Sequence, residues 1–346
     1  MAPNLHNSQF SPSQSNLYRH ATPNSEFYSH FSQAEILEII YALETRREIP
    51  LKFSYKGKGA KIWDNFYQKY IVPTWYRSSN VERDLLKDNF SYLNGDFQGY
   101  ETVNIIDVGA GNSYPVKDYI RRLQKLGKIN NYVALDISSE LLELSRLNFT
   151  KWFPKINIIT QNLDIENTQI HENLRQKDNK AGNIFLHLGV TMGNHQNRHQ
   201  VLLNFRDSMT ENDFLVFTNE NGSSSKWNGK VRGGCDYHAG NIYKWMQGSL
   251  GVKPEDCELI RKYDSVTDSV VANLKVRENY NLNFQFMEVS KNVEISAGEE
   301  ITIWRHHKFE IADIVAEIEA LGFQLVHCST NKYASHMMII CRLGTT

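Results

Sequence analysis

The pattern of hydrophobic and polar residues is clearest between residues 103 and 136. Residues 103–108 (VNIIDV) are an apolar, β-branched run without a helical period, which is typical of a buried strand in a parallel sheet. The pattern then predicts a helix over residues 114–126 and a second strand over residues 132–135, which ends at Asp136. We therefore expect a β-α-β unit with a carboxylate at the carboxyl edge of the sheet.

The residues after this unit predict the rest of a doubly wound sheet. A helix is expected at residues 138–153, and further strands at residues 156–159, 183–188 and 214–218. A helix at residues 309–321, ended by Gly322, leads into a closing β-hairpin of residues 323–330 and 335–343. Residues 101–220 and 306–346 are thus predicted to form one α/β domain of the Rossmann-like kind.

Other stretches predict a second lobe. Residues 33–46 form an amphipathic helix, and residues 279–290 and 299–309 alternate with period two and are joined through the turn SAGEE. We expect the two alternating runs to pair antiparallel, and residues 31–100 and 221–305 to form one substrate-binding lobe. Residues 1–30 are rich in Ser, Asn, Gln and Pro, so they are predicted to be a mobile arm.

A glycine-rich turn follows the first strand. Gly109-Ala110-Gly111 can turn tightly and lets a ligand approach the backbone, and Asn112 or Ser113 is placed to cap the next helix. In such sheets the acid that ends the second strand accepts hydrogen bonds from ribose hydroxyls. The turn and the carboxylate together predict a nucleoside-containing ligand.

The spacing of the glycines separates two such ligands. A dinucleotide fold requires G-x-G-x-x-G, and Tyr114 stands where the third glycine belongs, which disfavours NAD. The D-x-G-x-G form without a third glycine is typical of S-adenosylmethionine (AdoMet) methyltransferases. An ordinary turn without a ligand is the alternative.

Further candidates lie at the ends of later strands. Leu163 is predicted to lie against an adenine ring and the Asp164 carboxylate to accept from the exocyclic amine, the alternative for Asp164 being a loop carboxylate in solvent. Asn194 follows the fourth strand on the crevice side, where its amide can donate and accept at once.

The segment from Ile49 to Glu82 is unusually aromatic, and most of its rings are assigned to the core. Tyr55, beside the flexible KGKG, and Trp75-Tyr76, before an expected helix start, are the better site candidates.

Composition excludes several classes of partner. A net charge of −1 over 346 residues provides no basic field for nucleic acid, so a small molecule is the expected partner. No apolar run is long enough for a membrane span and no signal peptide is recognised, so we expect a cytoplasmic protein without a membrane partner.

No metal site is predicted. The four cysteines lie far apart, which argues against a zinc ribbon or a disulfide framework. His195 and His199 are four residues apart on an expected helix, but no third ligand lies nearby in the sequence. A solvated helix face is the preferred interpretation of these two histidines.

Five segments resemble the histidine-specific methyltransferase family, which includes the ergothioneine-pathway histidine Nα-methyltransferase and the fungal dimethylallyltryptophan N-methyltransferases. They are IPLKFSYKGKGAKIWD, IIDVGAGNS, YVALDIS, LGVTMGNH and GEEITIWRHHKF, and the resemblance extends over about residues 33 to 342. It implies a class I methyltransferase fold, whose sheet ends in an antiparallel strand.

The resemblance also implies roles for individual residues. Tyr55, Gly109, Gly111, Asp136 and Asp164 would contact AdoMet. Asn194 would hold the amino-acid end of the substrate, and Tyr76, or its neighbour Trp75, would stand at the position of a substrate-pocket tyrosine. Tyr237 would match a second tyrosine, one that grips the substrate carboxylate.

The chain departs from the family at two positions. In the histidine enzymes a Glu and a Ser read the imidazole ring, and alignment on Lys308-Phe309 places Trp304 and His306 there. A Trp cannot replace a carboxylate, so histidine is disfavoured as the substrate. We expect N-methylation of another amino acid or of an amine derived from one. O- or C-methylation, or a catalytically silent AdoMet-fold binding protein, are the alternatives, and the sequence does not indicate an oligomeric state.

Overall fold

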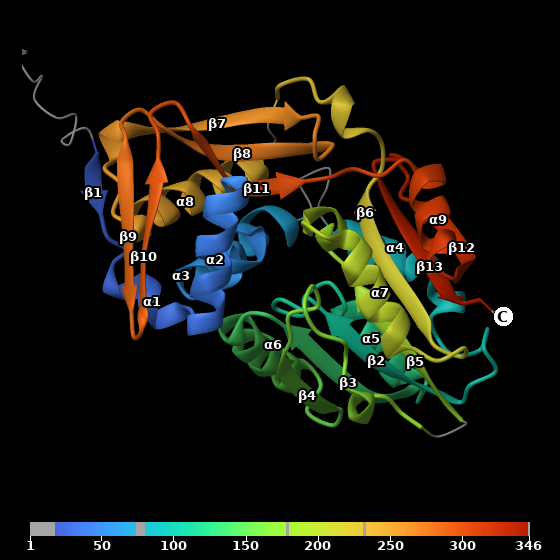
Figure 1. Ribbon diagram of the computed structural model, residues 1–346. Helices are drawn as coiled ribbons and strands as arrows, with labels where there is room; N and C mark the ends of the chain where they lie inside the picture. Colours follow the sequence, from blue (N-terminus) through green and yellow to red (C-terminus); the bar gives the residue numbers. More distant parts are fainter. Residues whose placement is uncertain (1–17, 74–79, 178–179, 231–232, 345–346) are drawn as a thin grey trace, which may run out of the picture.

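A seven-stranded sheet forms the centre of the protein and a second lobe lies beside it (Figure 1). The computed structural model describes residues 18–73, 80–177, 180–230 and 233–344. In sheet order, the strands are β12 (Phe323–Thr330), β13 (His336–Leu343), β6 (Phe214–Glu220), β5 (Ala181–His187), β2 (Thr102–Val108), β3 (Ile129–Asp136) and β4 (Asn157–Asn162). All neighbours are parallel except β13, which is antiparallel to β6 and β12. The predicted doubly wound α/β fold is confirmed.

Successive residues of the central strands point to opposite faces, and helices cover both faces. Ile105 packs on the face covered by α4 (Val81–Asp88), α5 (Lys117–Lys125) and α6 (Ser139–Trp152). Ile106 packs on the face covered by α7 (Arg198–Ser208) and α9 (Ile311–Ala320). Burial on both faces explains why the strands are apolar without alternation. No helix within the described ranges is long and apolar enough to cross a membrane.

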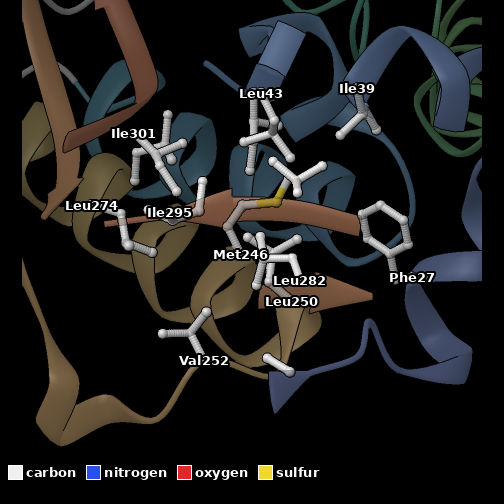
Figure 2. Close-up of a cluster of buried hydrophobic side chains, with 14 of the residues drawn as sticks. Phe27, Ile39, Leu43, Met246, Leu250, Val252, Leu274, Leu282, Ile295 and Ile301 are labelled. Carbon is white, nitrogen blue, oxygen red and sulfur yellow. The ribbon is translucent and has the colours of Figure 1, made fainter. Parts of the chain in front are cut away.

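The second lobe combines two distant parts of the chain. Its helical elements are α1 (Ser25–His30), α2 (Gln33–Arg46), the 3-10 helix η1 (Leu51–Tyr55), α3 (Lys58–Phe66), the π-helix η2 (Tyr67–Ile71) and α8 (Gly233–Leu250). One sheet contains β1 (Arg19–Ala21), β9 (Tyr280–Phe286) and β10 (Val289–Ile295), and the other contains β11 (Glu300–His306), β8 (Ser269–Val276) and β7 (Cys257–Asp264). Figure 2 shows their common core, where Phe27 and Leu43 meet Met246 and Leu282. A single hydrophobic core therefore spans both parts.

The predicted pairing of the two alternating runs is wrong. The first run turns back at Met287, which has a φ of 50°, so β9 pairs with β10. The second run, β11, pairs with β8 in the other sheet. The SAGEE turn is bonded to the end of β8, because Gly298 N–H donates to the Val276 carbonyl and Val276 N–H donates to the Glu299 carbonyl. These bonds direct the chain away from β10.

Two boundaries also differ from the prediction. Residues 19–30, assigned to the mobile arm, form β1 and α1, because Ala21 and Phe27 are buried in the lobe core. At the other boundary, α4 and the 3-10 helix η3 (Phe90–Tyr92) pack on the central sheet rather than in the lobe, since Leu85 and Phe90 belong to the core below α5.

The helix after the glycine-rich turn starts later than predicted. α5 begins at Lys117, without a side-chain cap, because Ser113 has a φ of 61° and Pro115 follows in a turn. Asn112 does not cap α5. Its amide donates instead to Asp64 of α3 at 2.7 Å.

Candidate functional site

A cavity lies where the central sheet meets the lobe. It encloses about 1000 Å³, counting the space at its mouth. Its walls are the glycine-rich turn after β2, the ends of β3, β4 and β5, and the lobe elements η1, α3 and η2. This is the carboxyl edge of the parallel strands, where doubly wound sheets bind their ligands.

The glycine-rich turn and Asp136 form one wall. Gly109 and Gly111 have φ values of 75° and 53°, which only glycine adopts without strain. The two Asp136 oxygens accept from the N–H groups of Gly111 and Ser138, each at 2.9 Å. A carboxylate offers about four lone-pair positions, so Asp136 can accept further hydroxyl donors from the cavity. Burial raises the pKa of Asp136 to about 6, against its backbone hydrogen bonds, which lower it.

Helix α3 lies directly over this turn. A Cβ atom on Gly111 would come within 2.5 Å of the Trp63 ring. Because Trp63 also borders the cavity, its indole forms a roof beside the glycine-rich turn. The bond from Asn112 to Asp64 fixes this arrangement, so the lobe and the sheet close the cavity together.

Asp107, the acid of the D-x-G-x-G motif, was not among the predicted site residues. It borders the cavity and accepts from the Tyr132 hydroxyl at 2.7 Å. Burial raises its pKa to about 7, the Tyr132 hydrogen bond opposes this, and the charge of Asp136 adds to it. Two buried carboxyl groups therefore titrate close to neutral pH on this wall.

Leu163 and Asp164 both border the cavity, as predicted for an adenine site. The Asp164 carboxylate is already engaged, however. It accepts from Lys52 Nζ at 2.7 Å and from the Asn167 amide at 2.8 Å, and its other oxygen accepts from Glu166 N–H at 3.1 Å. A loop carboxylate in solvent, the alternative interpretation, does not describe this residue. Only part of its accepting capacity remains for a ligand.

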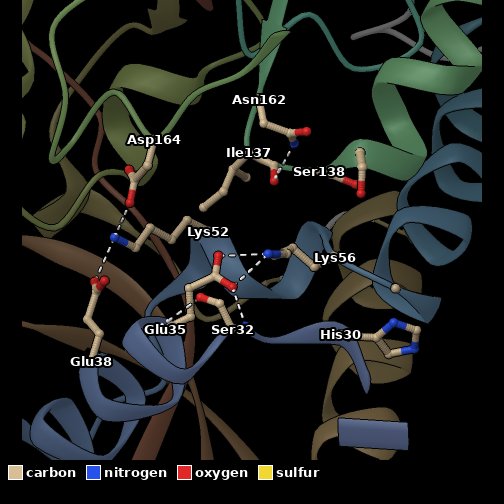
Figure 3. Close-up of polar contacts among 12 residues, drawn as sticks. His30, Ser32, Glu35, Glu38, Lys52, Lys56, Ile137, Ser138, Asn162 and Asp164 are labelled. Carbon is tan, nitrogen blue, oxygen red and sulfur yellow. Dashed lines mark hydrogen bonds and ion pairs between the residues drawn. The ribbon is translucent and has the colours of Figure 1, made fainter. Parts of the chain in front are cut away.

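Lys52 joins the lobe to the sheet. Figure 3 shows its ammonium group between Glu38 of α2, at 2.6 Å, and Asp164. Glu166 Oε2 lies 3.4 Å from the same nitrogen. Three carboxylates thus surround one largely buried lysine, which links α2 and η1 to the loop after β4.

Asn194 borders the cavity at the end of the 3-10 helix η5 (Thr191–Asn194). Its Oδ1 atom lies 3.2 Å from His306 Nδ1. The Asn194 side chain also hydrogen-bonds Tyr55, in the sense that lowers the pKa of the Tyr55 hydroxyl. The preceding Gly193 cannot carry a side chain, since a Cβ atom would lie 2.2 Å from the His307 carbonyl oxygen. The predicted residues Tyr55 and Asn194 therefore meet at the cavity.

The other predicted substrate residues do not line the cavity in the described part of the chain. Trp75 and Tyr76 lie outside the described residues. Tyr237 packs on Tyr70, with ring centroids 5.5 Å apart, and does not border the cavity. Trp304 and His306 share a face of β11, with ring centroids 6.2 Å apart. Neither borders the cavity, but His306 contacts Asn194, which does. Burial lowers the pKa of His306 to about 4, although the charge of Glu220 raises it.

The interpretation of His195 as part of a solvated helix face is wrong. Helix α7 begins at Arg198, and the His195 side chain is 10% exposed and borders the cavity, whereas His199 is exposed. His195 Nε2 lies 2.9 Å from His187 Nε2, and its Nδ1 lies 2.8 Å from Glu166. The sequence contains no signal that would bring residues 166, 187 and 195 together.

Comparison with known proteins identifies the family of the chain. The sequence model of the family described as histidine-specific, SAM-dependent methyltransferases matches residues 33–343. No curated protein matches the chain.

The chain is also similar to solved structures. One is an S-adenosylmethionine-dependent methyltransferase from Clostridium acetobutylicum, with 11% identity, 82% of this chain and 99% of that chain covered, and a TM-score of 0.43. Another is the magnesium protoporphyrin IX methyltransferase from Synechocystis with bound SAH, with 9% identity, 85% and 98% covered, and a TM-score of 0.44.

The family match extends over most of the chain, including both parts of the lobe and all seven strands of the sheet. The expected family, enzyme class and cofactor are thereby confirmed. The chain belongs to the histidine-specific, SAM-dependent methyltransferase family and is an AdoMet-dependent methyltransferase.

Proposed function

We propose that the enzyme N-methylates a small amine, either an amino acid or a compound derived from one, other than histidine. The observation that carries the proposal is the contact between Asn194 and His306 beside Trp304. By the family resemblance, Asn194 holds the amino-acid end of the substrate, and the two positions on β11 read the side chain. This chain has a neutral imidazole and an indole there, instead of a carboxylate and a hydroxyl.

The residues of the cavity fit AdoMet. Asp136 retains lone pairs for ribose hydroxyls, and the two glycines, which have no side chains, leave the backbone of the turn open to a ligand. Leu163 offers an apolar surface for adenine, and Ala110 lines the cavity between the two glycines. When bound, AdoMet supplies a methyl group on a positively charged sulfur. We assign these contacts, with Tyr55 and the remaining capacity of Asp164, to the cofactor.

The protein's task is to orient the amine and to exclude water. Holding two reactants in line lowers the barrier by up to about 7–11 kcal/mol in well-oriented systems, so a dedicated base is not required. The amine must arrive with a free electron pair, and its N–H groups need acceptors. The Asn194 oxygen and the Tyr55 hydroxyl oxygen can accept these bonds, since both carry lone pairs. Burial raises the pKa of Tyr55, so its hydroxyl stays neutral and does not act as a base.

Selectivity against histidine follows from the side chains on β11. A site that hydrogen-bonds a substrate ring rejects analogues strongly, because its own polar groups are stranded when the partner is missing. Burial keeps His306 uncharged near neutral pH, and its Nδ1–H is used by Asn194. The pair cannot act as a carboxylate toward an imidazole. An aromatic or otherwise apolar side chain suits this surface better.

The test is methyl transfer from labelled AdoMet to matched acceptors. Free histidine, tryptophan, aromatic amines with and without a prenyl group, and alcohols that replace each amine are incubated with the enzyme, and products are identified by mass spectrometry. We expect transfer to an amine nitrogen and negligible transfer to histidine. Transfer to the alcohols alone would instead support an O-methyltransferase.

A further inference from the structure

His187 and His195 meet edge to edge in the wall of the cavity. His187 Nδ1 lies 2.8 Å from the Val108 carbonyl oxygen, and His195 Nδ1 lies 2.8 Å from Glu166 Oε1. A carbonyl and a carboxylate only accept, so both Nδ1 atoms must carry a proton. The two Nε2 atoms then face each other at 2.9 Å.

This geometry determines how many protons the pair holds. Two nitrogens at hydrogen-bond distance need one proton between them, since two lone pairs would repel. With both Nδ1 protons in place, the pair holds three protons and one positive charge. A shared metal ion does not explain the contact, because imidazole nitrogens on one tetrahedral zinc lie about 3.3 Å apart.

The groups around the pair are consistent with one positive charge shared by the two rings. His187 is 1% exposed, and burial together with the charge of His195 lowers its pKa to about 3. Burial alone would raise the pKa of Glu166, but the hydrogen bond and charge of His195, with the charge of Lys52, lower it to about 2.

The other charged groups around the pair come from several elements. Lys52 from η1 lies beside Glu166, and Glu38 and Asp164 neutralise Lys52. Asp107 and Asp136 border the same cavity from β2 and β3. The contact from α7 is uncharged: the Phe205 ring packs edge-on to His187, with ring centroids 5.3 Å apart. Of these groups, Glu166 directly contacts the pair, and its negative charge favours the shared proton.

The pair connects the two turns that the reaction needs. Val108 directly precedes the glycine-rich turn, and His195 directly follows Asn194. The second turn is strained, because Val190 has a φ of 58°, which is rare for a β-branched residue. Such a backbone keeps its shape only where neighbouring contacts hold it. The His187–His195 bond and the Glu166 bonds to His195 and to Gln196 N–H are contacts of this kind.

We propose that His187 and His195 are positioning residues that share one proton, and that this proton holds the Asn194 turn against the glycine-rich turn. The role of Asn194 in holding the amine rests on the proposed function, whereas the shared proton does not. When pH rises far enough to remove the proton, two lone pairs face each other and the Asn194 turn is released. Methyl transfer should then decline on the alkaline side.

Nitrogen-15 NMR of the histidines in the full chain tests the proton directly. We expect a strongly downfield proton coupled to Nε2, which disappears in His187→Gln and in His195→Gln and persists in His199→Gln, a change at an exposed residue. Two neutral rings without this proton would overturn the proposal. Detection of the proton in an enzyme that methylates no amine would leave this inference intact and would reject the proposed function.

The pH profile of methyl transfer tests the positioning role. Glu166→Gln keeps an acceptor for His195 but removes the charge that stabilises the proton, so the alkaline limb should move to lower pH by about 1–3 units. Lys52→Met removes a neighbouring positive charge and should move the limb in the opposite direction. A limb that stays in place in both variants would overturn the proposal, because a merely structural contact does not change the proton affinity.

Discussion

Replacement of Asp136 by alanine should weaken AdoMet binding by about 100-fold or more. The carboxylate is positioned by two backbone N–H groups at 2.9 Å and keeps lone pairs toward the cavity. Two hydroxyl bonds to a charged acceptor contribute about 1.5–3 kcal/mol each, and the lower sum of about 3 kcal/mol corresponds to about 100-fold in Kd. Isothermal titration calorimetry on folded protein measures the loss, with Asp118→Ala, at an exposed acid of α5, as the control.

The same residue predicts a pH dependence. Burial raises the pKa of Asp136 to about 6, above its usual value of 3.8, so the native carboxyl keeps its proton more readily than the unfolded one. Its contribution to stability is therefore present below about pH 4 and is lost as pH rises through about 6.

Cofactor binding has the opposite dependence, because the charged form accepts hydroxyls best. The Kd for AdoMet should rise up to about tenfold per unit as pH falls below about 6, and this dependence should vanish in Asp136→Ala. An unchanged Kd and an unchanged profile in the folded variant would refute the ribose assignment. If the Kd profile has a second inflection near pH 7, its loss in Asp107→Asn assigns that inflection to Asp107.

Two further predictions concern the contacts that hold the site. Lys52→Met removes the cation that three carboxylates share, so it should lower the free energy of unfolding by about 1–3 kcal/mol, measured by chemical denaturation, and should weaken AdoMet binding, measured by calorimetry. The control Lys56→Met breaks an ion pair within the lobe and should leave the Kd for AdoMet unchanged. Gly193→Ala should destabilise the folded protein by about 1–3 kcal/mol or more, because the added Cβ would overlap a carbonyl oxygen. Gly240→Ala, in open space within α8, should stabilise the folded protein by about 0.5–1 kcal/mol. Equal shifts in the melting temperature of the two variants would contradict the packing argument.

The central sheet could be predicted because its signals are local. Each strand is an apolar run bounded by turn residues, and the glycine-rich turn and Asp136 follow from adjacent strand ends. The pairing of β11 could not be predicted in the same way. An alternating strand pairs equally well with either neighbour, and the choice of β8 depends on backbone bonds from residues 298 and 299 to Val276.

The ionic part of the site was missed for a related reason. Lys52, Glu166 and His187 come from η1, the loop after β4 and the end of β5, and each is an ordinary surface or core residue when considered alone. Their partners become known only once the lobe is placed on the sheet. Asp164 illustrates the consequence, since its position at a strand end was predictable but its engagement by Lys52 was not.

The central claim is that this member of the family does not methylate histidine, and the ratio of kcat/KM for histidine to that for the best aromatic amine tests it most directly. Trp304 and His306 lie where the resemblance places the imidazole-reading pair, and His306 contacts the Asn194 amide. We predict a ratio far below one for the wild-type enzyme and a higher ratio for Trp304→Glu combined with His306→Ser. Efficient trimethylation of histidine by the wild-type enzyme would contradict the account.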